Sequence, residues 1–118
     1  MVGYEQLASS LLSQSATALA GHGANQLLDQ NPEIAWRFAP NAFSSWQSLL
    51  AMRCHELAVA IEFSSPQIFV SAVDWARASF KARDVSQTDL KSGLMCLRDV
   101  LAEELPQPAA DTVTPCFE

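Results

Sequence analysis

The chain has 118 residues, of which 49% are hydrophobic and 17% charged, with 7 Lys and Arg against 13 Asp and Glu. A chain of this length removes roughly 65% of its unfolded surface from water, which is enough for a core without disulfide or metal support. The hydrophobic fraction excludes a disordered chain, and the formal net charge of −6 argues against nucleic acid or a membrane surface as partners. We therefore expect a single helical domain over residues 1–118.

Hydrophobic periodicity predicts helix along most of the chain, with Pro, Gly and Ser at the breaks. The first expected helix covers about residues 4–20, and Gly21 and Gly23 predict its end, because glycine tolerates positive φ and costs entropy inside a helix. A short turn over 24–30 follows. The apolar side of this first helix is expected to contain Tyr4, Leu7, Leu11, Ala18 and Leu19.

The next two helices are predicted from capping signals and apolar stripes. Residues 31–33 (Asn-Pro-Glu) have the order of an N-cap, a Pro at the first helical position and an acid in the first turn. A short helix therefore runs through Ile34, Trp36 and Phe38, and Pro40 ends it. A long central helix is expected from Ala42 to about Phe63. Its stripe consists of Phe43, Trp46, Leu50, Leu57 and Ile61.

Two further helices are predicted in the second half of the chain. Ser65-Pro66 begins one that ends near Arg83, and residues 86–89 (Ser-Gln-Thr-Asp) resemble a capping box with Asp in place of the usual Glu. Pro106 ends the second of these helices, and a last short turn runs over 109–113. The stripe of the first is Ile68, Phe69, Val73, Ala76 and Phe80; that of the second is Leu90, Leu94, Leu97, Val100, Leu101 and Leu105.

These segments predict an all-α fold, a single-domain antiparallel bundle of about five helices, since short connections favour antiparallel neighbours. Apolar runs in the sequence stay below the ~18 to 20 residues that a membrane span needs. The start, Met-Val-Gly-Tyr-Glu, lacks the basic region of a signal peptide. We expect a cytoplasmic protein.

Cysteine and histidine patterns indicate neither a disulfide framework nor a metal site. Cys54 and Cys96 are expected to be buried as small hydrophobic residues, and Cys116 to lie in a frayed, accessible tail. The histidines are His22 and His55. Cys54, His55 and Glu56 are consecutive on a helix and point about 100° apart, so they do not form one chelating face. We expect no catalytic residues, no cofactor and no metal.

Aromatic residues at helical spacing usually belong to a core, and we expect this of most of the three Trp and six Phe. Trp75 lies one residue off the predicted stripe, at its edge. We therefore take Trp75 and Phe63 as candidate partner-binding residues. The local excess of basic residues at Arg77, Lys81 and Arg83 is interpreted as a solvated helix face.

A Phe-x-x-x-Val-x-Trp segment (69–75) and a Leu-rich stretch ending in Glu-Glu-Leu-Pro (103–106) carry a family resemblance. With these motifs, residues 31–118 resemble the helical region that precedes the cobalamin-binding domain in many bacterial sensory and regulatory proteins. They are more weakly similar to the helical N-terminal domains of stressosome co-antagonists. The family's Asp-x-His-x-x-Gly ligand motif is absent around His22 and His55, so the resemblance implies a regulatory helical module without cobalamin binding by this chain.

Two functions from different classes follow as expectations. The first is a non-enzymatic intracellular regulatory or signalling module that acts through protein–protein interaction or homo-oligomerisation, with a protein partner or a second copy on its apolar edge. The alternative is a small-ligand sensor with an apolar, aromatic-lined pocket between helices. The resemblance further implies that the chain can be the N-terminal part of a longer protein.

Overall fold

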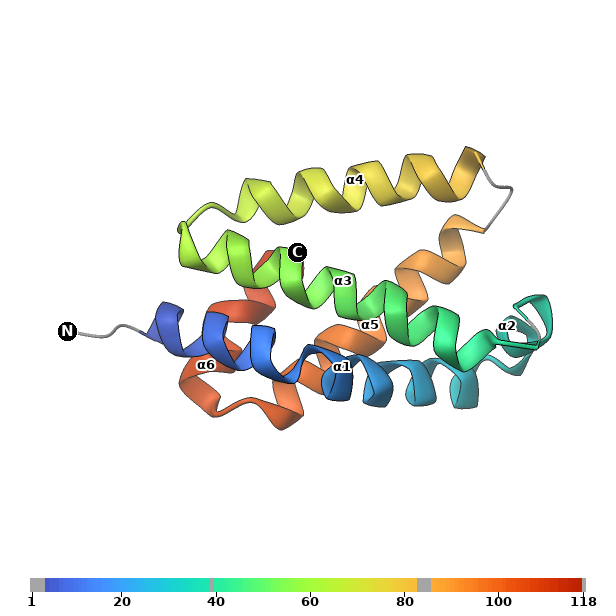
Figure 1. Ribbon diagram of the computed structural model, residues 1–118, viewed down its shortest axis with the longest axis horizontal. Coiled ribbons are helices and arrows are strands. Elements are labelled where there is room, and N and C mark those ends of the chain that lie inside the picture. Colours follow the sequence, from blue (N-terminus) through green and yellow to red (C-terminus); the bar gives the residue numbers. More distant parts are fainter. Residues whose placement is uncertain (1–3, 39, 83–85, 118) are drawn as a thin grey trace.

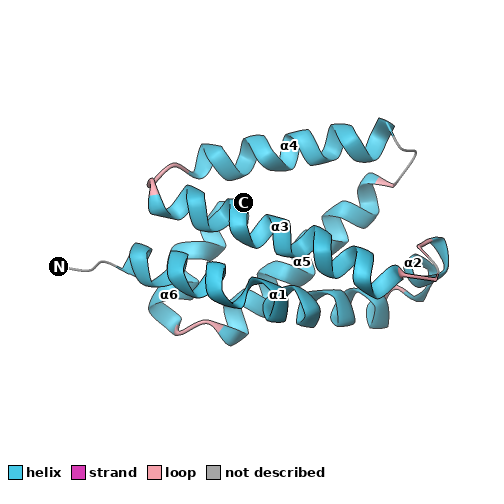
Figure 2. Cartoon of the chain, in the orientation of Figure 1, coloured by secondary structure: helices cyan, strands magenta, loops and turns pink. Residues whose placement is uncertain are grey.

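The computed structural model describes residues 4–38, 40–82 and 86–117. Within these ranges it contains helices and turns and no strand, which confirms the all-α class (Figures 1 and 2). The elements are α1 (Tyr4–Gln30), α2 (Pro32–Arg37), α3 (Ala42–Glu62), α4 (Pro66–Ala82), α5 (Gln87–Glu104), α6 (Gln107–Val113) and the 3-10 helix η1 (Thr114–Phe117).

The centre of the fold is the antiparallel pair α1 and α3 (Figure 1). The Ser9 hydroxyl donates to the Ala58 carbonyl at 3.0 Å, and the Gln47 side-chain amide donates to the Thr17 carbonyl at 3.1 Å. The residues that these contacts join increase in number along α1 and decrease along α3, so the two helices are antiparallel. On this pair, α4 packs mainly against α3, whereas α5 and α6 pack mainly against α1. The buried hydrophobic side chains of the described residues, apart from Ala42, form one cluster.

Helix α1 continues through the glycines that were expected to end it, so the predicted break at 21–23 and the turn over 24–30 are wrong. Both glycines are buried where neighbouring helices approach closely. A Cβ on Gly21 would lie 3.1 Å from Gln47 Nε2, and one on Gly23 would lie 3.1 Å from Leu50 Cδ1 and 3.7 Å from Leu97 Cα. The glycines therefore serve helix packing rather than helix termination.

The buried face of α1 also differs from the predicted one. Leu7 is 40% exposed and Ala18 is exposed, while Leu19 alone of the predicted residues with described side chains is buried. The buried face consists of Ala8, Leu12, Ala16, Leu19, Ala20, Ala24 and Leu27. Four of these seven are alanines, which let α3 approach closely, because the distance between helix axes depends on the side chains at the contact.

The capping signals place the later helix starts correctly, although not every cap forms. Asn31 precedes Pro32 at the start of α2, but its side-chain amide donates back to the Leu27 carbonyl at 3.2 Å instead of capping the helix. At the start of α5, the Ser86 hydroxyl accepts from the Thr88 backbone N–H at 3.2 Å. The predicted starts at Pro32 and near Ser86 are therefore confirmed.

The acidic residue of the expected capping box has a different partner. Asp89 is buried, and its two carboxylate oxygens accept hydrogen bonds from Arg37 Nε at 3.1 Å and Arg37 Nη2 at 2.6 Å. This bidentate pair is a charge-assisted contact with fixed geometry. It joins the end of α2 to the first turn of α5.

The turn between α3 and α4 is a tight one. Ser64 adopts a positive φ of 51°, and the backbone N–H groups of Ser64 and Ser65 donate to the carbonyls of Ile61 at 3.0 Å and Ala60 at 2.8 Å. This is the hydrogen-bond pattern of a Schellman motif, in which a residue in the left-handed region ends the helix. The chain reverses here, so α4 returns antiparallel to α3.

The predicted stripes are largely buried. Trp46, Leu50, Leu57 and Ile61 on α3 and Leu90, Leu97, Val100 and Leu101 on α5 are core residues. Phe43 and Ile68 differ, at 39% and 37% exposed, because each lies at the edge of its stripe. The side chains of Tyr4 and Phe80 and residues 83–85, which include Arg83, lie outside the part that the structure describes.

Candidate functional site

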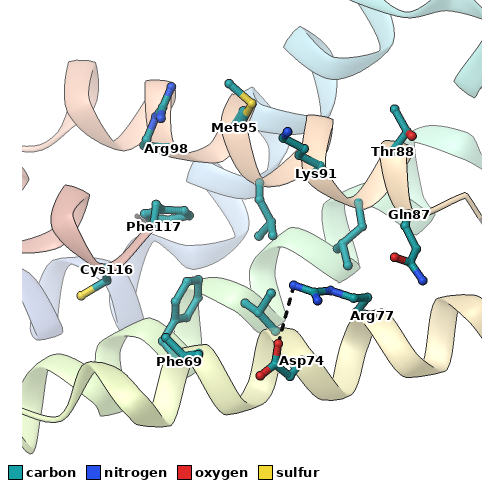
Figure 3. Close-up of a pocket in the computed structure, with 14 residues that line it drawn as sticks. Phe69, Asp74, Arg77, Gln87, Thr88, Lys91, Met95, Arg98, Cys116 and Phe117 are labelled. Atoms are coloured by element: carbon teal, nitrogen blue, oxygen red, sulfur yellow. Dashed lines mark ion pairs between the residues drawn. The ribbon is translucent and has the colours of Figure 1, made fainter.

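An open groove of about 700 Å³ lies between α4 and α5 (Figure 3). The two helices follow one another in the chain but rest on different neighbours, α4 on α3 and α5 on α1. They therefore diverge after the connection between them, as Figure 1 shows. The C-terminal η1 lines the groove together with them.

The interior of the groove is apolar. Phe69 on α4 and Leu90 on α5 are buried at 2% and 5% exposure, and Val73 and Leu94 are half-buried beside them. Phe117 of η1 meets Phe69 edge to face, with ring centroids 5.2 Å apart. These two rings lie next to each other in Figure 3. An apolar partner would therefore gain free energy by covering this surface.

The rim of the groove is basic, although the chain as a whole is acidic. The cationic residues that line the groove are Arg77, Lys91 and Arg98. Asp74 is the single carboxylate of the lining, which gives the lining residues a net charge of +2. Arg77 Nη2 lies 3.6 Å from Asp74 Oδ1 on α4, a contact between exposed side chains (Figure 3). The formal charge of the whole chain is −6. The groove is thus a local cationic surface.

The α5 side of the groove is a helical stripe in which two apolar residues lie between two cationic ones. It consists of Lys91, Leu94, Met95 and Arg98, at positions i, i+3, i+4 and i+7. Arg98 Nη2 lies 3.4 Å from Asp99 Oδ1, and among the described residues no ion pair of Lys91 is formed within 4.0 Å. The Lys91 ammonium is therefore available to a ligand.

Phe63 and Trp75, the predicted partner-binding residues, are both strongly exposed but do not line the groove. Phe63 caps α3 and is 68% exposed, whereas Trp75 lies in the middle of α4 and is 69% exposed. Trp75 shares one side of α4 with Ile68, which lies two helical turns earlier. The exposure of Trp75 agrees with its position off the buried stripe. Its role in binding a partner stays a prediction.

Residues that sequence reasoning missed lie in the groove and on α2. Lys91 and Arg98 line the groove, and Arg77, expected on a solvated face, lines it as well. Trp36 is 84% exposed, although it was expected in the core. A signal for Trp36 was present, because it lies two positions from Ile34 and so on the opposite side of a short helix.

The histidines and the central Cys-His-Glu segment are not brought together. His22 and His55 are exposed, Cys54 is fully buried, and the half-buried Glu56 carboxylate accepts from Arg53 Nη2 at 2.9 Å. Among the residues that the structure describes, no group of three His, Cys, Asp or Glu side chains is placed to hold a metal ion.

The three thiols have raised pKa values because they are removed from water. Burial raises the pKa of Cys54 from 9.0 to about 12. Burial raises the pKa of Cys96 too, with a smaller contribution from the nearby Asp99 carboxylate, and burial alone raises that of Cys116. Cys54 and Cys96 are buried as predicted, whereas Cys116 is half-buried in η1 and does not lie in a frayed tail. A raised pKa lowers the thiolate fraction, so these thiols are weak nucleophiles at neutral pH.

No protein-family model, curated protein or solved structure matches the chain. Its resemblance to the helical region before cobalamin-binding domains therefore stays a prediction. Within the described ranges, every helix is too short or too polar to cross a membrane.

Proposed function

We propose that the chain is a non-catalytic intracellular regulatory module that docks a protein partner through α4 and the groove beside it. The observation that carries this proposal is the groove itself, an open apolar surface edged by cations between two diverging helices. Grooves of this kind receive amphipathic segments of other proteins. The resemblance to the helical regions of sensory and regulatory proteins supports the regulatory part of the proposal.

The exposed side of α4 provides a second contact surface for the same function. Trp75 and Ile68 lie there, and Phe63 precedes the helix. Trp is among the residues that contribute most to binding free energy when an interface buries them. Trp75 lies two positions after Val73 and therefore on the side of α4 away from the groove, so we propose that a partner reaches both surfaces only by wrapping around α4.

The test compares Trp75→Ala with Trp36→Ala, which removes a ring of the same size that is also mostly exposed but lies on α2. Partners are captured from a lysate of the source organism and identified by mass spectrometry, and the molar mass is followed by light scattering. We expect Trp75→Ala to lose an identified partner, or dimer formation, that Trp36→Ala retains. Both variants should keep the stability of the parent within about 0.5 kcal/mol, as surface substitutions do.

A strict monomer at all concentrations with no captured protein would contradict the proposal, and a captured protein that does not depend on Trp75 would confine docking to the groove. A loss of stability of ~3 to 5 kcal/mol in Trp75→Ala would also contradict it, because that is the cost of truncating a core aromatic. Circular dichroism of both variants checks that the helical fold is retained.

A small-ligand sensor is the second candidate, favoured by the size of the groove. Its volume of about 700 Å³ falls in the range of roughly 300 to 1,000 Å³ that is usual for small-molecule sites. Phe69 and Phe117 provide an aromatic end for an apolar ligand. A thermal-shift titration with dodecanoate, a long-chain anion, tests this function, and a flat melting temperature would count against it.

A further inference from the structure

We infer that the partner segment received by the α4–α5 groove is an acidic amphipathic helix. Its apolar face would lie against Phe69, Val73 and Leu94, and its carboxylates against Lys91 and Arg98. This inference rests on the proposed function, since it names the chemistry of the partner that the same groove would bind.

Charge is the first argument. The groove is lined by three cations and one carboxylate in a chain whose formal net charge is −6. Arg77 pairs with Asp74 and Arg98 with Asp99, whereas Lys91 forms no ion pair among the described residues. The Debye length at physiological salt is about 8 Å, so a ligand in the groove responds mainly to the rim, where three cations outnumber the carboxylates of Asp74 and Asp99. A basic segment would be repelled by this rim, and an acidic one would be attracted.

The spacing of the cations is the second argument. Lys91 and Arg98 are seven residues apart on α5, which corresponds to about 10 Å along the helix axis. A carboxylate that pairs with one of these cations at its own position on α5 leaves the other without a partner unless that long side chain bends towards it. An acidic helix with two carboxylates two turns apart matches the spacing between Lys91 and Arg98. The apolar residues between its carboxylates then lie against Leu94 and Met95. The spread of the cations therefore favours a peptide over a ligand with one anionic group.

The shape and composition of the groove are the third argument. The bounding helices diverge, as Figure 1 shows, and the groove between them is open to solvent. Met95 is 44% exposed at the rim, and its flexible thioether adapts to different apolar side chains. The volume of about 700 Å³ suits the side chains of one helix face, with the partner backbone at the mouth.

The experiment uses two synthetic helical peptides with the same Leu and Phe face, one flanked by Glu and the other by Lys. Fluorescence anisotropy measures their binding to the full chain at low and high salt. We expect the Glu peptide to bind at least about tenfold more tightly than the Lys peptide, a difference of about 1.4 kcal/mol. The preference should shrink at high salt because the contacts are partly exposed.

A charge-reversal series locates the site. The double variant Lys91→Glu/Arg98→Glu should lose binding of the Glu peptide by about tenfold or more and gain binding of the Lys peptide. The single variant Lys91→Glu is also compared with its control Lys81→Glu, which changes the net charge equally, since Lys81 is exposed on α4 but does not line the groove. The Lys81→Glu control should bind the Glu peptide nearly as the parent does. Circular dichroism confirms that each variant is folded.

Each other outcome overturns the inference in a distinct way. Equal loss in Lys81→Glu and Lys91→Glu would mean that net charge, not the groove, attracts the peptide. Failure of the parent to bind the Glu peptide would overturn the inference while leaving the proposed function standing, provided that Trp75-dependent partner capture persists. The groove would be assigned to a small anionic ligand instead if one equivalent of dodecanoate displaced the bound peptide and the parent bound the Glu and Lys peptides equally well.

Discussion

At the scale of single residues, burial controls the chemistry of Cys54. The side chain is fully buried in the core, and its thiol pKa is raised to about 12. In the unfolded chain the same thiol ionises near 9.0. Folding is therefore linked to protonation of this group, since the native state retains a proton that the unfolded state releases.

The sign of the pH dependence follows directly. A raised native pKa gives stability that is complete below the unfolded pKa and is lost as pH rises towards the native pKa. We expect Cys54 to contribute a fall of about 1.4 kcal/mol per pH unit in the free energy of unfolding between about pH 9 and 12. Urea denaturation across this window should show a shallower fall for Cys54→Ala than for the parent. Parallel pH profiles would show that the thiol is not linked to folding.

At the scale of elements, glycines on α1 and α5 lie where each of these helices approaches α3 closely. Gly93 on α5 faces Trp46, and a Cβ there would lie 2.7 Å from Trp46 Cζ3. Trp46 is fully buried and also meets Phe38 edge to face at 5.3 Å, so its ring has little room to move. Gly21 on α1 differs, because its nearest neighbour is the flexible end of Gln47.

We expect opposite effects from alanine at these two glycines. In Gly93→Ala, overpacking against Trp46 costs about 1 to 3 kcal/mol and outweighs the ~1 kcal/mol that Ala gains over Gly inside a helix. In Gly21→Ala, the Gln47 amide shifts by a few tenths of an ångström, and its solvent-exposed hydrogen bond to the Thr17 carbonyl can be exchanged for one to water, so the helix gain dominates. Thermal and urea denaturation should place the parent between the two variants. A Gly93→Ala protein as stable as Gly21→Ala would contradict the packing described for α5.

The elements also show what the sequence alone can predict. The starts of α2 and α4 follow from Pro32 and Pro66, because the fixed φ of proline acts locally. The continuity of α1 through Gly21 and Gly23 was not predictable in this way, since it depends on contacts with α3 and α5 that lie far away in the sequence. Local chemistry therefore fixed the helix starts, and tertiary packing decided how far α1 extends.

At the scale of the whole molecule, the candidate site is a consequence of how the helices are layered. The stripe with Lys91 and Arg98 is visible in the sequence, and the exposure of Trp75 follows from its position off the buried stripe. The groove itself was not predictable, because it exists only where α4 rests on α3 while α5 rests on α1. A tighter α4–α5 pair would have buried the same side chains against each other.

The most direct test of the docking account is to map the contact surface of the Glu peptide by amide-resolved NMR on the full chain. The account predicts that the largest shift changes fall on groove residues of α4 and α5, among them Val73, Leu94 and Met95. Saturation should give one dissociation constant for all of them. Changes centred on α2 around Trp36, or along the exposed side of α1, with the groove amides unmoved, would contradict it.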